Sequence, residues 1–192
     1  MLHPLLMCTY FFLLLMYGLP VILLPARPSW WIILLIFITT FALPVANFLF
    51  LKFTGSVADL TLPQRRERLL PFGFISAVYV FVTVMFYWKF PIPNLIKLLV
   101  IVTALVVMAT VVTFFYKVSV HSLSIWGAIG MLLPLNRVSE ENLLLVPTAI
   151  AILLAGLVMT SRLALNAHTP REVMMGSVLG FAVGFFGMIL LF

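Results

Sequence analysis

The run LIKLLVIVTALVVMATVVTFFY, residues 95–116, decides the fold class of this chain. Lys97 is its one charged side chain, and apolar residues fill most of the other positions. A helix rises about 1.5 Å per residue, so a run of this length crosses a hydrocarbon core of about 30 Å. Apolar runs of roughly 16 to 24 residues recur along the sequence, which suits transmembrane helices.

The composition excludes a soluble domain. Of the 192 residues, 65% are hydrophobic and only 8% are charged, so most side chains must face lipid or other helices. Strands of a membrane barrel would alternate in polarity over about 10 residues, a pattern that is absent here. We therefore expect an all-α membrane protein with a single integral membrane domain over residues 1–192.

Seven spans are predicted, and a six-span bundle stays open because the third and fifth spans are the shortest. Glycines at a spacing of four in the last span, Gly176, Gly180 and Gly184, predict the close approach of a neighbouring helix. Pro44 in the second span frees a backbone carbonyl, so we expect a kink there and a neighbouring group that satisfies the carbonyl. The spans are Leu5–Leu24, Trp30–Leu51, Pro71–Trp88, Leu95–Tyr116, Ser119–Leu135, Leu143–Thr160 and Val173–Phe192.

The seven-span topology places most of the reactive side chains on one membrane face. The loops at 52–70, 117–121 and 161–172 share that face. The net charge of +6 lies in short loops, which suits membrane surfaces and phosphate groups, and no basic tract is long enough to bind nucleic acid. The first face holds Lys52, Arg65, Arg66, Arg68, Lys117, His121, Arg162, His168, Arg171 and Glu172, and the opposite face holds Arg27, Lys89, Lys97 and Arg137.

The segment SRLALNAHTPRE, residues 161–172, combines groups suited to phosphate chemistry. Arg162 offers fixed donors to a phosphate, and His168 can be a nucleophile or a base. Glu172 can orient the second nitrogen of that histidine, and the N-terminus of the following helix is itself an anion site. The segment predicts phosphoryl transfer.

A second segment, KVSVHS at residues 117–122, adds Lys117, Ser119 and His121. The pattern Ser-Arg-x5-His-x3-acid at 161–172 is similar to the third signature of the type-2 phosphatidic acid phosphatase superfamily. VSVH within the second segment resembles the second signature, usually Pro-Ser-Gly-His. The two spans between the signatures also fit this family.

Three features depart from the family pattern. Glu172 stands where the family has aspartate, and Val118 and Val120 replace the proline and glycine of the second signature. The first signature, Lys-x6-Arg-Pro, is absent as written. QRRERLLP at residues 64–71 is the expected substitute, because two spans separate it from His121 and return it to the same face.

The resemblance implies a metal-independent lipid-phosphate phosphohydrolase, which cleaves a phosphoric monoester or diphosphate on a lipid. His168 would attack phosphorus and become a phosphohistidine, while Glu172 holds its tautomer. His121 would protonate the leaving alkoxide and then activate water. Five scattered acidic residues cannot build a carboxylate cage, so we expect no metal and no cofactor. The expected phosphate-binding groups are Arg162, Ser119, the N–H of Val120, Arg65, Arg68 and Lys117.

Other interpretations stay open. Thr169 and Glu172 match a helix capping box, which is compatible with catalysis. The Arg65–Arg68 cluster can instead bind lipid headgroups, and Lys117 beside Tyr116 is typical of an interfacial anchor. The alternative function is non-enzymatic, a lipid-phosphate carrier or a degenerate binder of the same fold.

The expected partners are the bilayer and a lipid phosphate, in a bacterial-type cytoplasmic membrane. Phosphatidic acid, phosphatidylglycerol phosphate, an isoprenoid diphosphate and a lipid A phosphate are all candidates. The excess of basic residues on the active face favours the cytoplasmic side. The family works more often at the outer face, and we lean towards that side. Neither the substrate nor the oligomeric state follows from the sequence.

Overall fold

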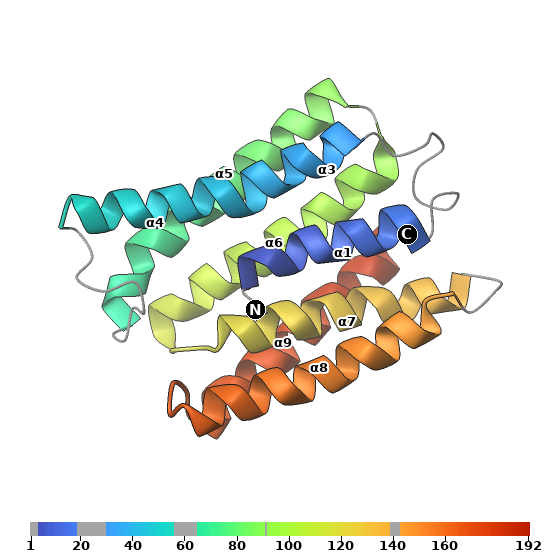
Figure 1. Ribbon diagram of the computed structural model, residues 1–192. Coiled ribbons are helices and arrows are strands. Elements are labelled where there is room, and N and C mark those ends of the chain that lie inside the picture. The colour runs from blue at the N-terminus through green and yellow to red at the C-terminus, as the bar shows by residue number, and fades with distance from the viewer. Residues whose placement is uncertain (1–3, 19–29, 56–64, 91, 139–142) are drawn as a thin grey trace.

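The computed structural model describes residues 4–18, 30–55, 65–90, 92–138 and 143–192. Within these ranges the chain forms helices and short connections, without any strand. α3, η1 and α4 follow one another without a break, so the described residues form seven helical rods (Figure 1). The prediction of an all-α bundle is confirmed. The elements are α1 (Pro4–Gly18), α3 (Trp30–Phe37), the π-helix η1 (Ile38–Ala42), α4 (Leu43–Phe53), α5 (Arg65–Lys89), α6 (Pro93–Phe115), α7 (Val120–Val138), α8 (Leu145–Ala164) and α9 (Pro170–Leu191).

Five of the described rods are long and apolar enough to cross a membrane. The apolar part of α1, Pro4–Met16, is shorter. α7 is not among the five, because polar residues such as His121, Asn136 and Arg137 lower its mean hydropathy. The five are Trp30–Phe53, Glu67–Lys89, Pro93–Phe115, Leu145–Ala164 and Pro170–Leu191.

The third predicted span started too late. α5 begins at Arg65, whereas apolarity alone placed its start at Pro71. The charged turn before Pro71 carries no apolar signal, yet it is part of the helix, and Pro71 lies inside the helix. Arg68 consequently lies on a helix and not in a flexible loop.

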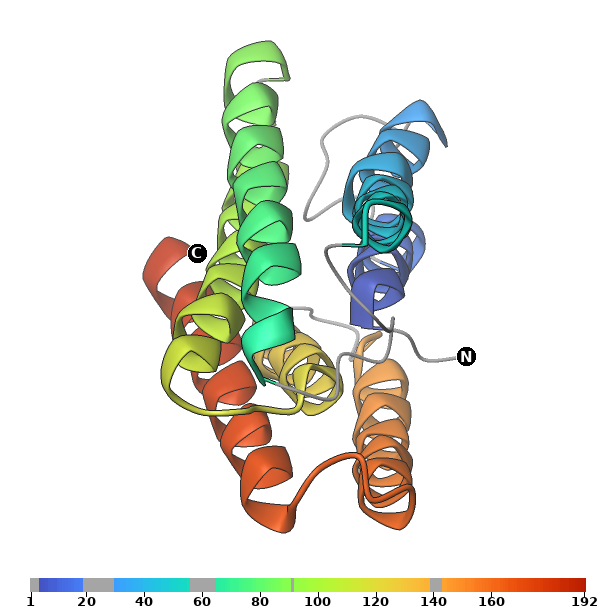
Figure 2. The ribbon, with the colours of Figure 1, turned by 90° about the vertical axis from the view of Figure 1, so that its left-hand side faces the viewer.

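The rods run side by side, with α7 in the middle of the bundle (Figures 1 and 2). α7 packs against α9, α8, α1 and α6. α5 and α6 form one side of the molecule in Figure 2, and α1 with the α3–α4 rod forms the other. The ends of α4, α6 and α8 gather with the starts of α5, α7 and α9 at the left of Figure 1. This common end is the face on which the sequence placed the reactive residues.

The glycines of α9 allow its backbone to touch the backbone of α7. A Cβ atom added to Gly180 or Gly184 would press against a carbonyl oxygen of α7, at Leu123 and Gly127 respectively, and one added to Gly176 would press against the carbonyl oxygen of Ser119, directly before α7. All three glycines are buried. The predicted close helix approach is confirmed, and α7 and α9 form the tightest pair of the bundle.

The carbonyl freed by Pro44 finds a partner on a neighbouring helix. Pro44 has no N–H to offer the oxygen of Thr40, and the hydroxyl of Tyr79 on α5 donates to that oxygen at 3.1 Å. The distortion takes the form of η1, where the Leu43 N–H donates to the carbonyl of Ile38. The expectation that a neighbour satisfies the carbonyl is confirmed.

Candidate active site

His168 and Glu172 form a hydrogen-bonded pair at the start of α9. The Nδ1 atom of His168 lies 2.7 Å from Oε2 of Glu172, and both side chains are largely buried, with 7% and 14% exposed. The backbone of Thr169 donates to the same carboxylate oxygen at 3.3 Å, and the Thr169 hydroxyl accepts from the Glu172 N–H at 3.3 Å. Glu172 thus completes a capping box and orients His168 at once.

The pair fixes which nitrogen of His168 is available. A carboxylate at Nδ1 favours the tautomer with the proton on that atom, which leaves a lone pair on Nε2. No hydrogen-bond donor reaches Nε2 within the part of the chain that the structure describes. In this tautomer Nε2 is the ring nitrogen that can accept a proton or a hydrogen bond.

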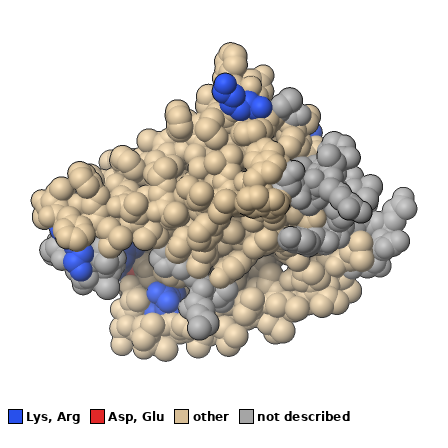
Figure 3. All heavy atoms as spheres, turned by 45° about the horizontal axis from the view of Figure 1, so that its top comes forward, with Lys and Arg blue, Asp and Glu red and all other residues tan. Residues whose placement is uncertain are grey.

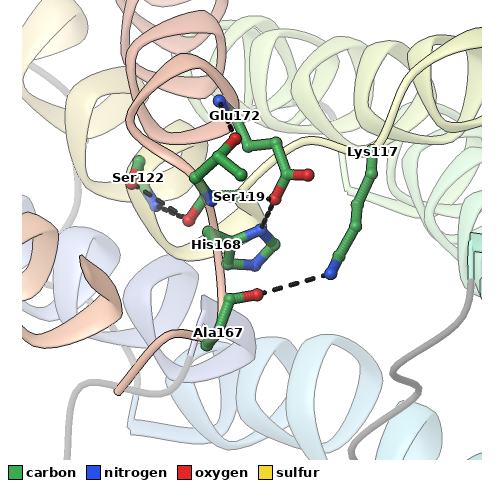
Figure 4. A network of polar contacts seen from close by, with 7 residues as sticks. Lys117, Ser119, Ser122, Ala167, His168 and Glu172 are labelled. Atoms are coloured by element: carbon green, nitrogen blue, oxygen red, sulfur yellow. Dashed lines mark hydrogen bonds and ion pairs between the residues drawn. The ribbon is translucent and has the colours of Figure 1, made fainter. Parts of the chain in front are cut away.

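The connection between α8 and α9 turns His168 towards the interior. Asn166 adopts a left-handed conformation with φ of 51°, which reverses the chain after α8. The N–H of Ala167 donates to the carbonyl of Arg162 at 3.1 Å. From the connection between α6 and α7, the Lys117 ammonium donates to the Ala167 carbonyl at 3.4 Å, beside the imidazole (Figure 4).

A cavity of about 1110 Å³ opens at this end of the bundle. Its mouth brings together cations and imidazoles from four separate parts of the chain. Figure 3 shows Lys and Arg side chains beside a hollow at the same end of the molecule. Of the predicted residues, the cavity is lined by Arg68, Lys117, His121, Arg162 and His168.

The electrostatics of the mouth suit a neutral imidazole. Burial lowers the pKa of His168, and the positive charges of Arg68 and Lys117 lower it further, against the opposing effect of Glu172. Arg68 is itself only 8% exposed and lies close enough to interact with the charge of Glu172. The lowered pKa favours the neutral imidazole of His168. The described residues hold no group of three His, Cys, Asp or Glu side chains that could bind a metal ion.

The comparison with known families concerns the second half of the chain. Residues 113–192 match the PAP2 superfamily. The match confirms the resemblance seen in the sequence, and members of this superfamily are generally phosphatases. No curated protein and no solved structure matches the chain. The PAP2 segment runs from the end of α6 through α7, α8 and α9 and contains both histidines of the cavity.

Within the PAP2 segment, Ser119 differs in position from the other predicted phosphate-binding residues. Its side chain is fully buried and does not line the cavity. Its Oγ accepts from the Ser122 N–H at 3.4 Å and from the Ser122 hydroxyl at 3.0 Å, which caps the N-terminus of α7. Its own N–H donates to the carbonyl of Glu172 at 3.2 Å and joins the first turns of α7 and α9. Val120, next in the chain, does line the cavity.

Ser124 and Ser161 are among the polar side chains that line the cavity without having been predicted as site residues. Ser124 lies one turn after His121, and its hydroxyl donates to the His121 carbonyl at 3.0 Å. Ser161 precedes Arg162 on α8. Helical spacing from the two motifs was the signal that could have found them. The side chain of Arg65 lies outside the described residues, so its assignment stays a prediction.

Proposed function

We propose that this chain is a metal-independent lipid-phosphate phosphohydrolase that acts through a phosphohistidine at one membrane face. The observation that carries the proposal is the His168–Glu172 pair, 2.7 Å apart, at the mouth of a cationic cavity. A histidine held by a carboxylate through Nδ1 presents Nε2 as a nucleophile. The PAP2 match supports the same chemistry.

In the first step, Nε2 of His168 attacks phosphorus and the bond to the lipid oxygen breaks. The leaving alkoxide takes a proton from His121, which lines the same cavity. In the second step, His121 accepts a proton from water, the water oxygen attacks the phosphohistidine, and phosphate leaves with His168 restored. Glu172 holds the imidazole through both steps.

Cationic groups of the mouth stabilise the charge that develops on the phosphoryl oxygens. Nε of Arg162 is buried and has no hydrogen-bond partner among the described residues, so it can donate to an anion. Arg68 and Lys117 add positive charge, and Val120 offers its N–H at the first turn of α7. Electrostatic stabilisation of this kind supplies most of the catalysis in phosphoryl transfer.

The substrate is a phosphomonoester or diphosphate on a lipid, in a bacterial-type cytoplasmic membrane. Support comes from the apolar helices that surround the cavity, since a lipid substrate is dissolved in the same bilayer that such helices can cross. Phosphatidic acid, phosphatidylglycerol phosphate, isoprenoid diphosphates and lipid A phosphates share the required headgroup chemistry. The proposed working side is the outer face.

The test is phosphate release from a panel of these lipids by purified protein in EDTA, with wild type compared against His168→Ala. We expect release by wild type only, inhibition by vanadate, and acid-labile, base-stable label on His168 from radioactive substrate. Activity that EDTA abolishes and Mg²⁺ restores contradicts the mechanism. Lipid binding without release or label by any variant assigns the chain to the non-enzymatic binders.

A further inference from the structure

The cavity does not stop at the polar mouth but continues inward between apolar side chains. Beyond His121 and His168, its wall is formed mostly by apolar side chains of α1, α4, α5, α6, α7 and α8, and Cys8, Thr110 and Ser124 add a few polar groups. The deepest lining residues on four of these helices are Phe11, Tyr79, Val102 and Met131. The site thus has a charged end and an apolar end.

The depth of the apolar part matches one leaflet of a bilayer. On α7 the lining extends from His121 to Met131, and on α5 from Arg68 to Tyr79. At about 1.5 Å per residue, both stretches span roughly 15 Å. The hydrocarbon core of a membrane is about 30 Å thick, so the cavity reaches the region of the midplane.

The inner end of the cavity is closed by packed side chains. On each helix, the next inward-facing residues are buried in one core cluster and do not line the cavity. Phe86 of α5 is fully buried, and Leu99 of α6 and Leu132 of α7 are 1% and 2% exposed. The other residues of this plug are Phe12, Leu15, Leu98 and Leu135.

We infer that the cavity seats a hydrocarbon chain of the lipid substrate inside the bundle, and that its closed inner end limits the length of chain accepted. The inference rests on the proposed function, because the cationic mouth fixes the phosphate and thereby the start of the chain. The lining inward of the mouth is mostly apolar, which complements a hydrocarbon chain. Residues before position 113 form much of this wall, outside the PAP2 segment.

Ala128 is the position at which to shorten the cavity. It lines the cavity on α7, seven residues beyond His121, which is about 10 Å along the helix. In Ala128→Leu we expect kcat/KM for a dipalmitoyl phosphatidic acid to fall at least about tenfold relative to a dihexanoyl one, as for methylenes misfitted in an apolar pocket. The matched control is Ala149→Leu, at an exposed position of α8, where both substrates should behave as in wild type.

Hydrolysis of nitrophenyl phosphate, which has no lipid chain, reports whether Ala128→Leu keeps an intact site. With that activity retained, equal losses for long and short chains, or no loss for either, overturn the inference.

A second measurement does not depend on turnover. A non-hydrolysable phosphonate analogue of phosphatidic acid, with a photoreactive group at the end of one chain, is bound and irradiated. We expect label on peptides containing Phe11, Tyr79 or Met131. Label confined to lipid-facing residues such as Phe81 and Leu153 overturns the inference. Label inside the cavity together with no phosphate release by wild type retains the chain-binding cavity and rejects the enzyme.

Discussion

The Oε2 atom of Glu172 accepts from His168 Nδ1 at 2.7 Å and from the Thr169 N–H at 3.3 Å. One carboxylate oxygen therefore caps the N-terminus of α9 and also orients the imidazole of His168. The rotamer of Glu172 is held by the helix start, so the direction of Nε2 is fixed before any substrate binds. Preorganisation of this kind avoids reorientation during the reaction.

Replacing His168 and replacing His121 should have different effects on phosphoenzyme formation and turnover. His168→Ala should abolish both the phosphoenzyme and turnover, because it removes the nucleophile. His121→Ala should cost about 10²–10⁴ in rate, the usual value of a general acid or base. With nitrophenyl phosphate, whose leaving group needs little protonation, His121→Ala should still form phosphoenzyme and accumulate it. Quench-flow with radioactive substrate measures both species, and label on another residue contradicts the assignment of the nucleophile.

Arg68 should contribute to the transition state although it lies far from the histidines in sequence. Arg68→Ala should lower kcat/KM by a factor that corresponds to about 2–4 kcal/mol of lost transition-state stabilisation, as for other donors that stabilise developing charge. Arg171→Ala is the control, because Arg171 is exposed at the same end of the bundle. Melting temperatures in detergent check that both variants fold. Equal, small losses of kcat/KM in the two variants would indicate that Arg68 binds lipid headgroups and does not stabilise the transition state.

The pH dependence of His168 reactivity should follow its lowered pKa. The neutral form is the reactive one, so reactivity should persist below the usual histidine pKa of about 6.5 and fall only as pH drops through the lowered value. Arg68→Ala removes a positive charge and should move the acid limb to higher pH. Carbethoxylation of the His168 peptide, followed by mass spectrometry across pH, measures this. A limb that stays in place or moves to lower pH contradicts the prediction.

Substitution by alanine should lower the stability of the protein at a buried glycine but not at an open one. Gly180→Ala places a Cβ against the backbone carbonyl of Leu123, which should cost about 1–3 kcal/mol of stability. Gly156→Ala meets nothing within 4 Å and should be neutral or stabilising, because alanine favours a helix by about 1 kcal/mol over glycine. Unfolding in detergent measures both. Equal stability of the two variants would show that the α7–α9 backbone contact does not make Gly180 sensitive to substitution.

The partner of the carbonyl freed by Pro44 can be tested with a double-mutant cycle. Tyr79→Phe should destabilise the protein by about 1–3 kcal/mol, since it leaves the Thr40 carbonyl without a donor. In a Pro44→Ala background the new N–H can donate to that carbonyl, so the same change should cost less. Tyr87→Phe, at a 65% exposed position, is the control. If the effects of the two substitutions on stability are additive, Tyr79 and Pro44 do not act through the same carbonyl.

The sequence predicted the parts of this structure that depend on local spacing. Apolar runs located all seven rods, and the four-residue spacing of His168 and Glu172 predicted their contact. The start of α5 was missed because a charged helical turn has no apolar signal. The burial of Ser119 could not be predicted, since it depends on how α7 packs against α9. The cavity could not be predicted either, because its wall combines residues of six helices, α1, α4, α5, α6, α7 and α8, and their order in space does not follow from local sequence.

The contact between α7 and α9 has a consequence for motion. Their backbones touch along Gly176, Gly180 and Gly184, and the Ser119 N–H to the Glu172 carbonyl joins their first turns. We therefore expect the two helices to move together, with His121 on α7 and His168 directly before α9. Admission and release of a bulky ligand must come from shifts of the surrounding rods, α1, α4, α5 and α8. We expect the two imidazoles to keep their separation when the surrounding helices shift, so the proposed catalytic pair stays assembled while a ligand enters or leaves.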